Sequence, residues 1–388
     1  MDLALSDAER AFAEEVRAFL AEHLVLPGDF ASTDEEVAWG RRWQATLAEG
    51  AMVGIHWPSA YGGRDATPVQ VALYNMEYAR ARAPQPVNRV GINLAGPTLL
   101  ARGTDEQRAR WLPAILDASE IWCQLFSEPD AGSDLAGLTT RAERDGDAWR
   151  VTGAKVWASR AHYADRGLLL ARTDWSVPKH AGITVFGLDL RAAGVEVAPL
   201  VQMNGDAHFN QVFLDGVEVP DADRIGDVGE GWRVAMTTLS NERTTIGGGG
   251  GGVPARGSGA IAEAVRIWNE EAGPATKTAV MRDELVKLWA RAEVLRMTNI
   301  RASQNRKAGN PGPEGSIAKL EFAKVNMDIY EFCVDLLGAA GLAGYDFEMR
   351  RAENLGLTGP PGSSRKMFLR ARANSIEGGT SEIQRNII

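Results

Sequence analysis

The spacing of the apolar residues changes twice along the chain, and these two changes constrain the fold more than any other feature. Over residues 1–118, apolar residues such as Phe12 and Val16 recur at helical spacing, as on one face of an amphipathic helix. Over residues 119–228, polar and apolar residues alternate in short runs separated by Gly, Asp and Pro, which is the pattern of β-strands. Helical spacing returns over residues 229–388. The sequence therefore predicts an α+β protein with a helical domain, a β domain and a second helical domain.

The net charge and the two ends of the chain limit its partners and its location. The formal net charge of -9 disfavours nucleic acid or an anionic membrane as the main partner, because binding to either needs clustered lysine and arginine. The acidic N-terminal sequence lacks the apolar stretch of a signal peptide, and no window approaches the roughly 18 apolar residues of a membrane helix. We therefore expect a cytoplasmic protein. The last residues carry no helix stop signal, which leaves open whether the natural chain continues beyond Ile388.

The cysteines give no support for a disulfide or for a metal site. Cys123 and Cys333 lie far apart in the sequence, each in apolar surroundings. That placement favours buried free thiols in a reducing compartment. No metal-ligand pattern of His, Cys, Asp and Glu accompanies them, so we expect no metal ion.

Three short segments narrow the choice of enzyme class. They are "FSEPDAGSDLAG" (126–137), "KVWAS" (155–159) and "EGGTSEIQRN" (377–386). In order and spacing they resemble segments of the acyl-CoA dehydrogenases, and the resemblance extends over essentially the whole chain. It implies an N-terminal helical domain (1–118), a central antiparallel β-barrel or sandwich (119–228), and a C-terminal four-helix bundle (229–388). It also implies FAD as cofactor, an acyl-CoA substrate, and a tetramer.

The activity implied by the resemblance is the introduction of a trans-2 double bond into an acyl-CoA thioester. Such a reaction needs a base for the α-proton, a hydride acceptor opposite the β-carbon, and donors for the enolate oxygen. FAD accepts the hydride, and an electron-transfer flavoprotein is the expected electron acceptor. Two alternatives share these segments: a non-catalytic or half-site subunit of a heteromeric dehydrogenase, and an acyl-CoA oxidase that passes electrons to oxygen.

The first two segments supply the flavin contacts that the resemblance implies. Ser127 holds the pyrimidine edge of the flavin, Gly132 allows close approach of the backbone, and Ser133 lies along the bound acyl-CoA. Trp157 covers one flavin face and Ser159 bonds the N5 edge. The remaining cofactor contacts are expected from Gln124, Phe126, Thr380 and Glu382. On composition alone, a polar turn is the favoured interpretation of the first segment, and a tryptophan buried in a β core is the usual interpretation of Trp157.

The catalytic base is where the sequence departs from the commoner family pattern. Many members carry a glutamate at the position of Gly378, and Glu377 lies one residue early. The isovaleryl-type and long-chain-type members instead use a glutamate before an arginine on the first helix after the β domain, as in "LSNERTT", so Glu242 takes the role and Arg243 is expected at the substrate. Gly378 can still donate its backbone N–H to the thioester carbonyl. The alternative is that Glu242 and Arg243 form a solvated pair on a helix face.

The six glycines that follow this helix have two interpretations. Without side chains, Gly247–Gly252 leaves room for a bulky, branched or steroid-type acyl group. A helix break without a ligand role follows equally well from the conformational entropy of glycine.

Two further segments depart from the family pattern. The family's Arg-x-x-Phe-Gly contact to the flavin pyrophosphate corresponds to "WNEEAG", with Asn269 at the arginine position and Glu270 and Glu271 after it. The family's Gln-x-x-Gly-Gly segment corresponds to "DLLGAAG", with Asp335 and Ala339 at the altered positions. Both segments are ones that a subunit lends to its neighbour. The chain is therefore either one subunit of a heteromer with a paralogous partner, or a homotetramer that binds the pyrophosphate differently.

Overall fold

The structure is a computed structural model in which two compact units can be distinguished. The first unit comprises the chain up to Asn241 and the second begins at Glu242, so the division falls within one helix. The predicted domain boundaries after residues 118 and 228 stay predictions. The residues that the structure describes are 5–246, 256–307, 312–342 and 363–388.

Helices form the N-terminal part of the first unit, as the spacing predicts. Capping boxes form where Ser or Thr stands three residues before Glu or Gln at a helix start: Ser6 with Glu9, and Thr104 with Gln107, each exchange hydrogen bonds there. The helices are α1 (Asp7–His23), α2 (Thr33–Glu49), α3 (Pro68–Arg80), α4 (Gly96–Arg102) and α5 (Asp105–Leu116), with a π-helical turn, η2 (Gly91–Ala95), before α4.

Helix α6 (Gly231–Ile246) begins in the first unit and packs on this helical core. Val234 and Ala235 are buried in the same apolar cluster as α4 and α5. The hydroxyls of Thr98 and Thr238 lie 2.8 Å apart and are buried. The start of α6 is therefore fixed by the N-terminal helices, whatever follows it along the chain.

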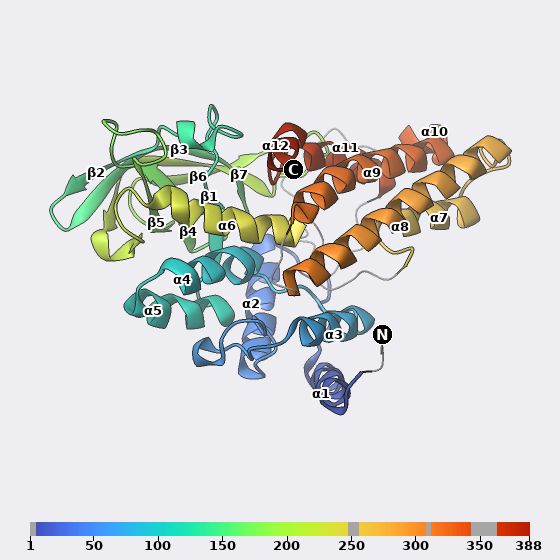
Figure 1. Ribbon diagram of the computed structural model, residues 1–388, viewed down its shortest axis with the longest axis horizontal. Coiled ribbons are helices and arrows are strands. Elements are labelled where there is room, and N and C mark those ends of the chain that lie inside the picture. Colours follow the sequence, from blue (N-terminus) through green and yellow to red (C-terminus); the bar gives the residue numbers. More distant parts are fainter. Residues whose placement is uncertain (1–4, 247–255, 308–311, 343–362) are drawn as a thin grey trace. The chain divides into compact units, whose positions relative to one another are not determined.

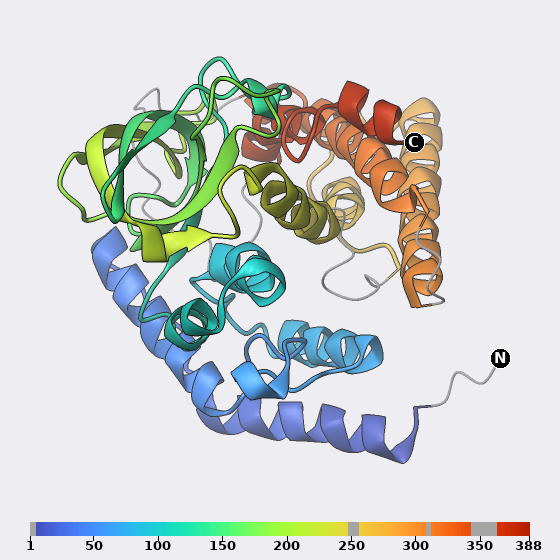
Figure 2. The same ribbon diagram turned by 60° about the vertical axis from the view of Figure 1, so that its left-hand side comes forward.

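The central part of the first unit is a mostly antiparallel sheet in the order β6-β7-β3-β2-β4-β5-β8, with β1 on β4. Strands β1 and β2 pair with β4 in parallel, and the other strand pairs named here are antiparallel. Figure 2 shows the strands curling around one another, and the space they enclose is filled by buried residues that include Trp149, Phe186 and Val212. The strands are β1 (Trp122–Leu125), β2 (Arg141–Asp145), β3 (Ala148–Ser159), β4 (Arg166–Arg172), β5 (Ile183–Asp189), β6 (Val195–Leu200), β7 (Phe209–Pro220) and β8 (Arg224–Ile225).

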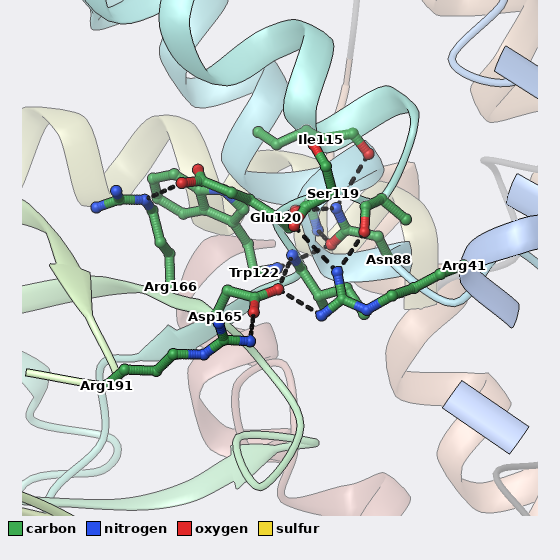
Figure 3. A network of polar contacts seen from close by, with 12 residues as sticks. Arg41, Asn88, Ile115, Ser119, Glu120, Trp122, Asp165, Arg166 and Arg191 are labelled. Carbon is green, nitrogen blue, oxygen red and sulfur yellow. Dashed lines mark hydrogen bonds and ion pairs between the residues drawn. The ribbon is translucent and has the colours of Figure 1, made fainter. Parts of the chain in front are cut away.

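Buried polar groups join the N-terminal helices to the sheet (Figure 3). Asn88 donates to the carbonyls of Ile115 (3.0 Å) and Glu120 (2.9 Å) and accepts from the amide of Trp122 (2.9 Å). Asp165 accepts from the Arg41 guanidinium at 2.6 Å. Because each buried group has partners from distant parts of the chain, this junction fixes the start of β1 and the approach to β4.

The second unit is helical, which confirms the third part of the predicted order. Its core gathers around α9, where Ile329, Phe332 and Cys333 pack with residues of the neighbouring helices. Figure 1 shows α8 and α9 running side by side. Cys123 and Cys333 are both buried and free, as predicted. The helices are α7 (Ala260–Glu270), α8 (Ala279–Lys307), α9 (Glu314–Leu337), α10 (Ala339–Leu342), α11 (Ser364–Ala371) and α12 (Ser381–Ile387).

Candidate active site

The loop between β1 and β2 is held in place by a buried carboxylate. Glu128 accepts hydrogen bonds from the amide (2.7 Å) and hydroxyl (2.9 Å) of Thr139 and from the amide of Thr140 (2.9 Å). The Lys155 ammonium lies 2.7 Å from the same carboxylate and donates to the carbonyl of Phe126 at 3.1 Å. Lys155 lies on β3, so this single pair joins the first predicted flavin segment to the second.

Both members of this pair are charged at neutral pH. Burial raises the pKa of Glu128, but the Lys155 charge and the hydrogen bonds from Lys155, Thr140 and Thr139 outweigh it and bring the pKa to about 2. Burial lowers the pKa of Lys155 to about 8, against the attraction of Glu128. An ionised pair with all its hydrogen bonds made is the form in which a buried carboxylate and ammonium are tolerated.

The tip of the loop is open to solvent. A Cβ atom at Gly132 would meet nothing within 4 Å, and Gly132 and Ser133 are exposed. Backbone hydrogen bonds between Glu128 and Ala131 close the turn. The Ser127 carbonyl accepts from the Val156 amide at 2.9 Å, so the residue predicted to hold the flavin pyrimidine is fixed beside β3.

A bulge in β3 turns Trp157 out of the sheet. The pairing with β7 shifts between Lys155 and Ala158, and Trp157 has a φ of 60°, which a non-glycine residue rarely adopts. Bulges next to active sites commonly redirect a side chain. Trp157 is 56% exposed, and its ring meets that of Phe209 edge-on at 5.6 Å. The alternative of a core tryptophan is therefore wrong for the described conformation.

The predicted residues of the first unit thus lie together on one set of segments. Gln124 and Phe126 lie at the end of β1 and directly after it, with Phe126 buried. Ser159 ends β3, two residues beyond Trp157. Sequence reasoning missed Glu128 and Lys155, although both lie inside the segments that it singled out.

In the second unit, the C-terminal segment forms a tight turn at the start of α12. Gly378 and Gly379 have φ values of 64° and 94°, a region that favours glycine. The Gln384 side chain donates to the carbonyl of Gly378 at 2.9 Å, and the Lys319 ammonium donates to that of Gly379 at 2.5 Å. Thr380 caps α12 by accepting from the Ile383 amide. The turn is therefore built from backbone groups held by buried side chains.

Two carboxylates near this turn are engaged in ion pairs. Glu377 receives both terminal nitrogens of Arg370 (3.2 and 2.8 Å) and the Asn374 amide (2.6 Å). Glu382 is exposed and pairs with Arg385 at 3.1 Å. Glu377 is thus tied to α11 and the turn after it.

The side chains of Glu242 and Arg243 lie outside the described part of the structure, as does the glycine run 247–252. The backbone of α6 is helical through both residues to Ile246. Arg102, on α4, donates to the Thr237 hydroxyl at 3.3 Å, one turn before the predicted base.

The segment expected to correspond to the family's pyrophosphate contact lies at the end of α7. Arg266 pairs with three carboxylates, those of Glu263 (2.7 Å), Glu270 (3.4 Å) and Glu271 (2.5 Å). The hydrogen bonds that Arg266 donates to Glu263 and then to Glu271 raise the pKa of Arg266 further. Asn269 lies on the same turn. The carboxylates outnumber the guanidinium, so this end of α7 carries excess negative charge.

Comparison with known proteins identifies the family. Models of the acyl-CoA dehydrogenase N-terminal, middle and C-terminal domains match residues 6–119, 123–217 and 229–388. Acyl-CoA dehydrogenase IpdE1 of Mycobacterium tuberculosis is 37% identical, over 99% of this chain and 97% of its own length. The chain belongs to the acyl-CoA dehydrogenase family. The predicted resemblance and the fold class are confirmed.

Solved acyl-CoA dehydrogenases share the fold over the whole chain. The Tcur3481-Tcur3483 steroid ACAD superposes with a TM-score of 0.77 at 27% identity, covering 99% of this chain and 97% of that one. The ChsE4-ChsE5 complex from Mycobacterium tuberculosis gives a TM-score of 0.75 at 26% identity, covering 100% and 97%. Members of the family are FAD-dependent oxidoreductases.

The residues of this acyl-CoA dehydrogenase fit a flavin. An exposed indole beside a second aromatic ring provides a flat apolar face for a tricyclic ring system, and Trp157 with Phe209 supplies it. The open loop tip at Gly132 leaves the backbone free to approach a ligand. Among the described residues no group of three or more His, Cys, Asp and Glu side chains is placed to hold a metal ion. None of the described helices is both long and apolar enough to cross a membrane.

Proposed function

We propose that this acyl-CoA dehydrogenase oxidises the α,β bond of a bulky acyl-CoA, with Glu242 as the base. When bound, FAD supplies the hydride acceptor for the β-carbon. Trp157 covers one face of the ring, Ser127 and Ser159 bond its edges, and Gln124, Phe126, Thr380 and Glu382 complete the cofactor contacts. Ser133 and Arg243 contact the substrate, and the backbone N–H of Gly378 binds the thioester oxygen as negative charge develops on it.

The observation that carries the choice of base is the state of Glu377. This carboxylate is the one beside Gly378, and Arg370 and Asn374 hold it through three hydrogen bonds. A carboxylate whose oxygens already accept three hydrogen bonds must break some of them before it can take a proton from a substrate. Position 378 itself has no side chain. Glu242 is then the family position left to remove the α-proton.

A substitution that keeps shape and removes basicity tests the assignment. Glu242→Gln is expected to retain the yellow flavin and to lose its bleaching by acyl-CoA under anaerobic conditions, by about 100-fold or more in rate. Glu377→Gln is the matched control and is expected to keep most of the rate. Bleaching by the Glu242→Gln enzyme at the wild-type rate would contradict the proposal.

Two features favour a bulky acyl group. One of the solved relatives is named a steroid ACAD, and the glycine run 247–252 follows the proposed base directly. We infer a branched, cyclic or steroid-type acyl group. An anaerobic panel of straight-chain, branched and steroid acyl-CoA esters tests this, and bleaching by straight-chain esters alone would contradict it.

A heteromeric assembly is the second part of the proposal, and the α7 cluster favours it. A pyrophosphate is repelled by the excess negative charge around Arg266, so a paralogous subunit is inferred to supply that contact. The names of two solved relatives each join two proteins.

An electron-transfer flavoprotein is the proposed electron acceptor, and hydrogen peroxide release would instead indicate an oxidase. The cytoplasmic location stays a prediction.

A further inference from the structure

Asn88 and Asp165 lie on segments of the first unit that are distant in sequence, and both form hydrogen bonds with residues 120–122 (Figure 3). Asn88 bonds the carbonyl of Glu120 and the amide of Trp122, both at 2.9 Å. Asp165 bonds the residue between them: its backbone amide donates to the Ile121 carbonyl at 2.8 Å, and its carboxylate accepts from the Ile121 amide at 2.7 Å. The residue after Asn88 and the turn before Asp165 are therefore held close together.

The turn before Asp165 is itself well defined. The Arg160 amide donates to the His208 carbonyl at 2.8 Å, and the Tyr163 amide donates back to the Arg160 carbonyl at 3.3 Å. Arg160 has a φ of 62°. The Tyr163 ring packs on the buried cluster that contains Val87, two residues before Arg89. Arg89, Arg160 and Tyr163 thus converge from two segments.

The charges in this cluster do not cancel. Burial and then the Arg160 charge lower the pKa of Arg89, so the two guanidinium groups are close enough to repel, although the Arg89 side chain as a whole is exposed. Neither guanidinium has a hydrogen-bond or ion-pair partner within the described ranges of the chain. Glu36 is the carboxylate near Tyr163, and it is buried. The two guanidinium groups thus lie near one another, and the one carboxylate named here lies near Tyr163.

The Tyr163 hydroxyl adds a donor without an acceptor. It is buried and has no hydrogen-bond partner among the described residues. Burial raises the pKa of Tyr163 to about 12, against the attraction of the Arg160 charge, so the hydroxyl keeps its proton. A buried hydroxyl without a partner is unfavourable unless something supplies an acceptor. An oxygen of an anion would satisfy it.

We propose that Arg89, Arg160 and Tyr163 bind a carboxylate at the far end of the substrate's acyl group. The inference rests on the proposed function, because it takes Ser159 to lie at the N5 edge of the flavin, where the reacting carbons must be. Arg160 follows Ser159 directly. The long pantetheine arm separates the CoA phosphates from those carbons by more bonds than an arginine side chain spans. With the CoA phosphates out of reach, the acyl group is the source that we infer for an anion held here, and guanidinium groups suit a carboxylate.

Paired substrates test the site. Succinyl-, glutaryl-, adipoyl- and suberoyl-CoA, each with its ω-methyl ester, are compared by kcat/KM for flavin reduction and by calorimetric Kd on the anaerobic flavin-loaded enzyme. We expect the wild type to prefer the free acid of the best-fitting length by about tenfold or more. Arg89→Gln and Arg160→Gln each reduce that preference about tenfold, and leave kcat/KM and Kd for the ω-methyl ester unchanged. Tyr163→Phe reduces it by less. Arg42→Gln, an exposed arginine of the same unit, has no effect.

Three results would overturn the inference. The wild type could bind acid and ester equally at every length, or the preference could survive the double arginine variant. The variants could instead weaken free CoA as much as the acids, which would identify the anion as a phosphate. If none of the acyl-CoA compounds bleaches the flavin, the proposed function fails. The calorimetric Kd values of free acid and ω-methyl ester still decide whether the carboxylate site exists. If the Arg160→Gln protein does not fold, the comparison of free acid and ω-methyl ester is made with Arg89→Gln, because Arg89 is exposed.

Discussion

At the scale of residues, the proposed flavin segments depend most on the ion pair between Glu128 and Lys155. The side chains are 4% and 0% exposed, so neither charge has water as an alternative partner. We predict that Lys155→Met destabilises the protein by about 3–5 kcal/mol, because it leaves a buried carboxylate unpaired. The double variant Glu128→Gln/Lys155→Met should recover much of that loss.

Urea unfolding followed by circular dichroism measures these differences. The control is Lys179→Met, which breaks the exposed pair with Asp134 and should change stability by less than about 1 kcal/mol. A Lys155→Met protein as stable as the control would show that the pair does not hold the segments.

The same carboxylate gives a pH prediction. The pKa of Glu128 falls from 4.5 to about 2 on folding, so between these values the unfolded chain binds a proton that the folded chain does not. Its stabilising contribution is therefore complete above pH 4.5 and is lost as the pH falls toward 2. We expect the double variant to lose stability less steeply than the wild type over this window. Parallel acid unfolding curves for the two proteins would contradict the assignment.

At the scale of elements, α8 carries an apolar stripe that the second unit does not cover. Val286, Ala290, Val294 and Met297 are exposed, with Val286, Val294 and Met297 at 58%, 55% and 50%, and their spacing places them on one helix face. We call these four residues the α8 stripe. An exposed apolar face of this kind marks a protein contact, and we propose that a second subunit covers it.

We predict that Val294→Glu with Met297→Glu shifts the protein to a smaller species in light scattering, because two buried carboxylates would oppose association. Glu284→Lys is the control, since it reverses an exposed charge of α8 outside the α8 stripe. An unchanged mass for the double variant would exclude the stripe as the subunit contact.

At the scale of the whole molecule, the heteromer proposal predicts incomplete cofactor loading. The chain purified alone should carry clearly less than one FAD per protomer, because the α7 end that is proposed to correspond to the family's pyrophosphate contact is acidic here. Absorbance of released flavin against protein concentration measures the ratio. Full occupancy of the isolated chain would support a homotetramer instead.

The order of elements, the capping boxes and the identity of the site segments could be predicted because each depends on residues close in sequence. Apolar spacing specifies helix or strand locally, and Ser6 with Glu9 or Thr104 with Gln107 specifies a helix start. The buried run that forms β4 (Arg166–Arg172) was not singled out, since a short apolar run without alternation is compatible with helix or strand.

The sequence by itself determined the family, the arrangement of helical and β parts, and which segments are proposed to bear the cofactor residues. Only the tertiary structure decided that Trp157 faces outward, that Glu128 and Lys155 clamp its segment, that Arg370 holds Glu377, and that Arg89 lies near Arg160. Each of these depends on a bulge register or on a partner that the local sequence pattern does not specify. Local patterns carry no information about such partners, because burial and hydrogen bonding are settled only when the segments meet.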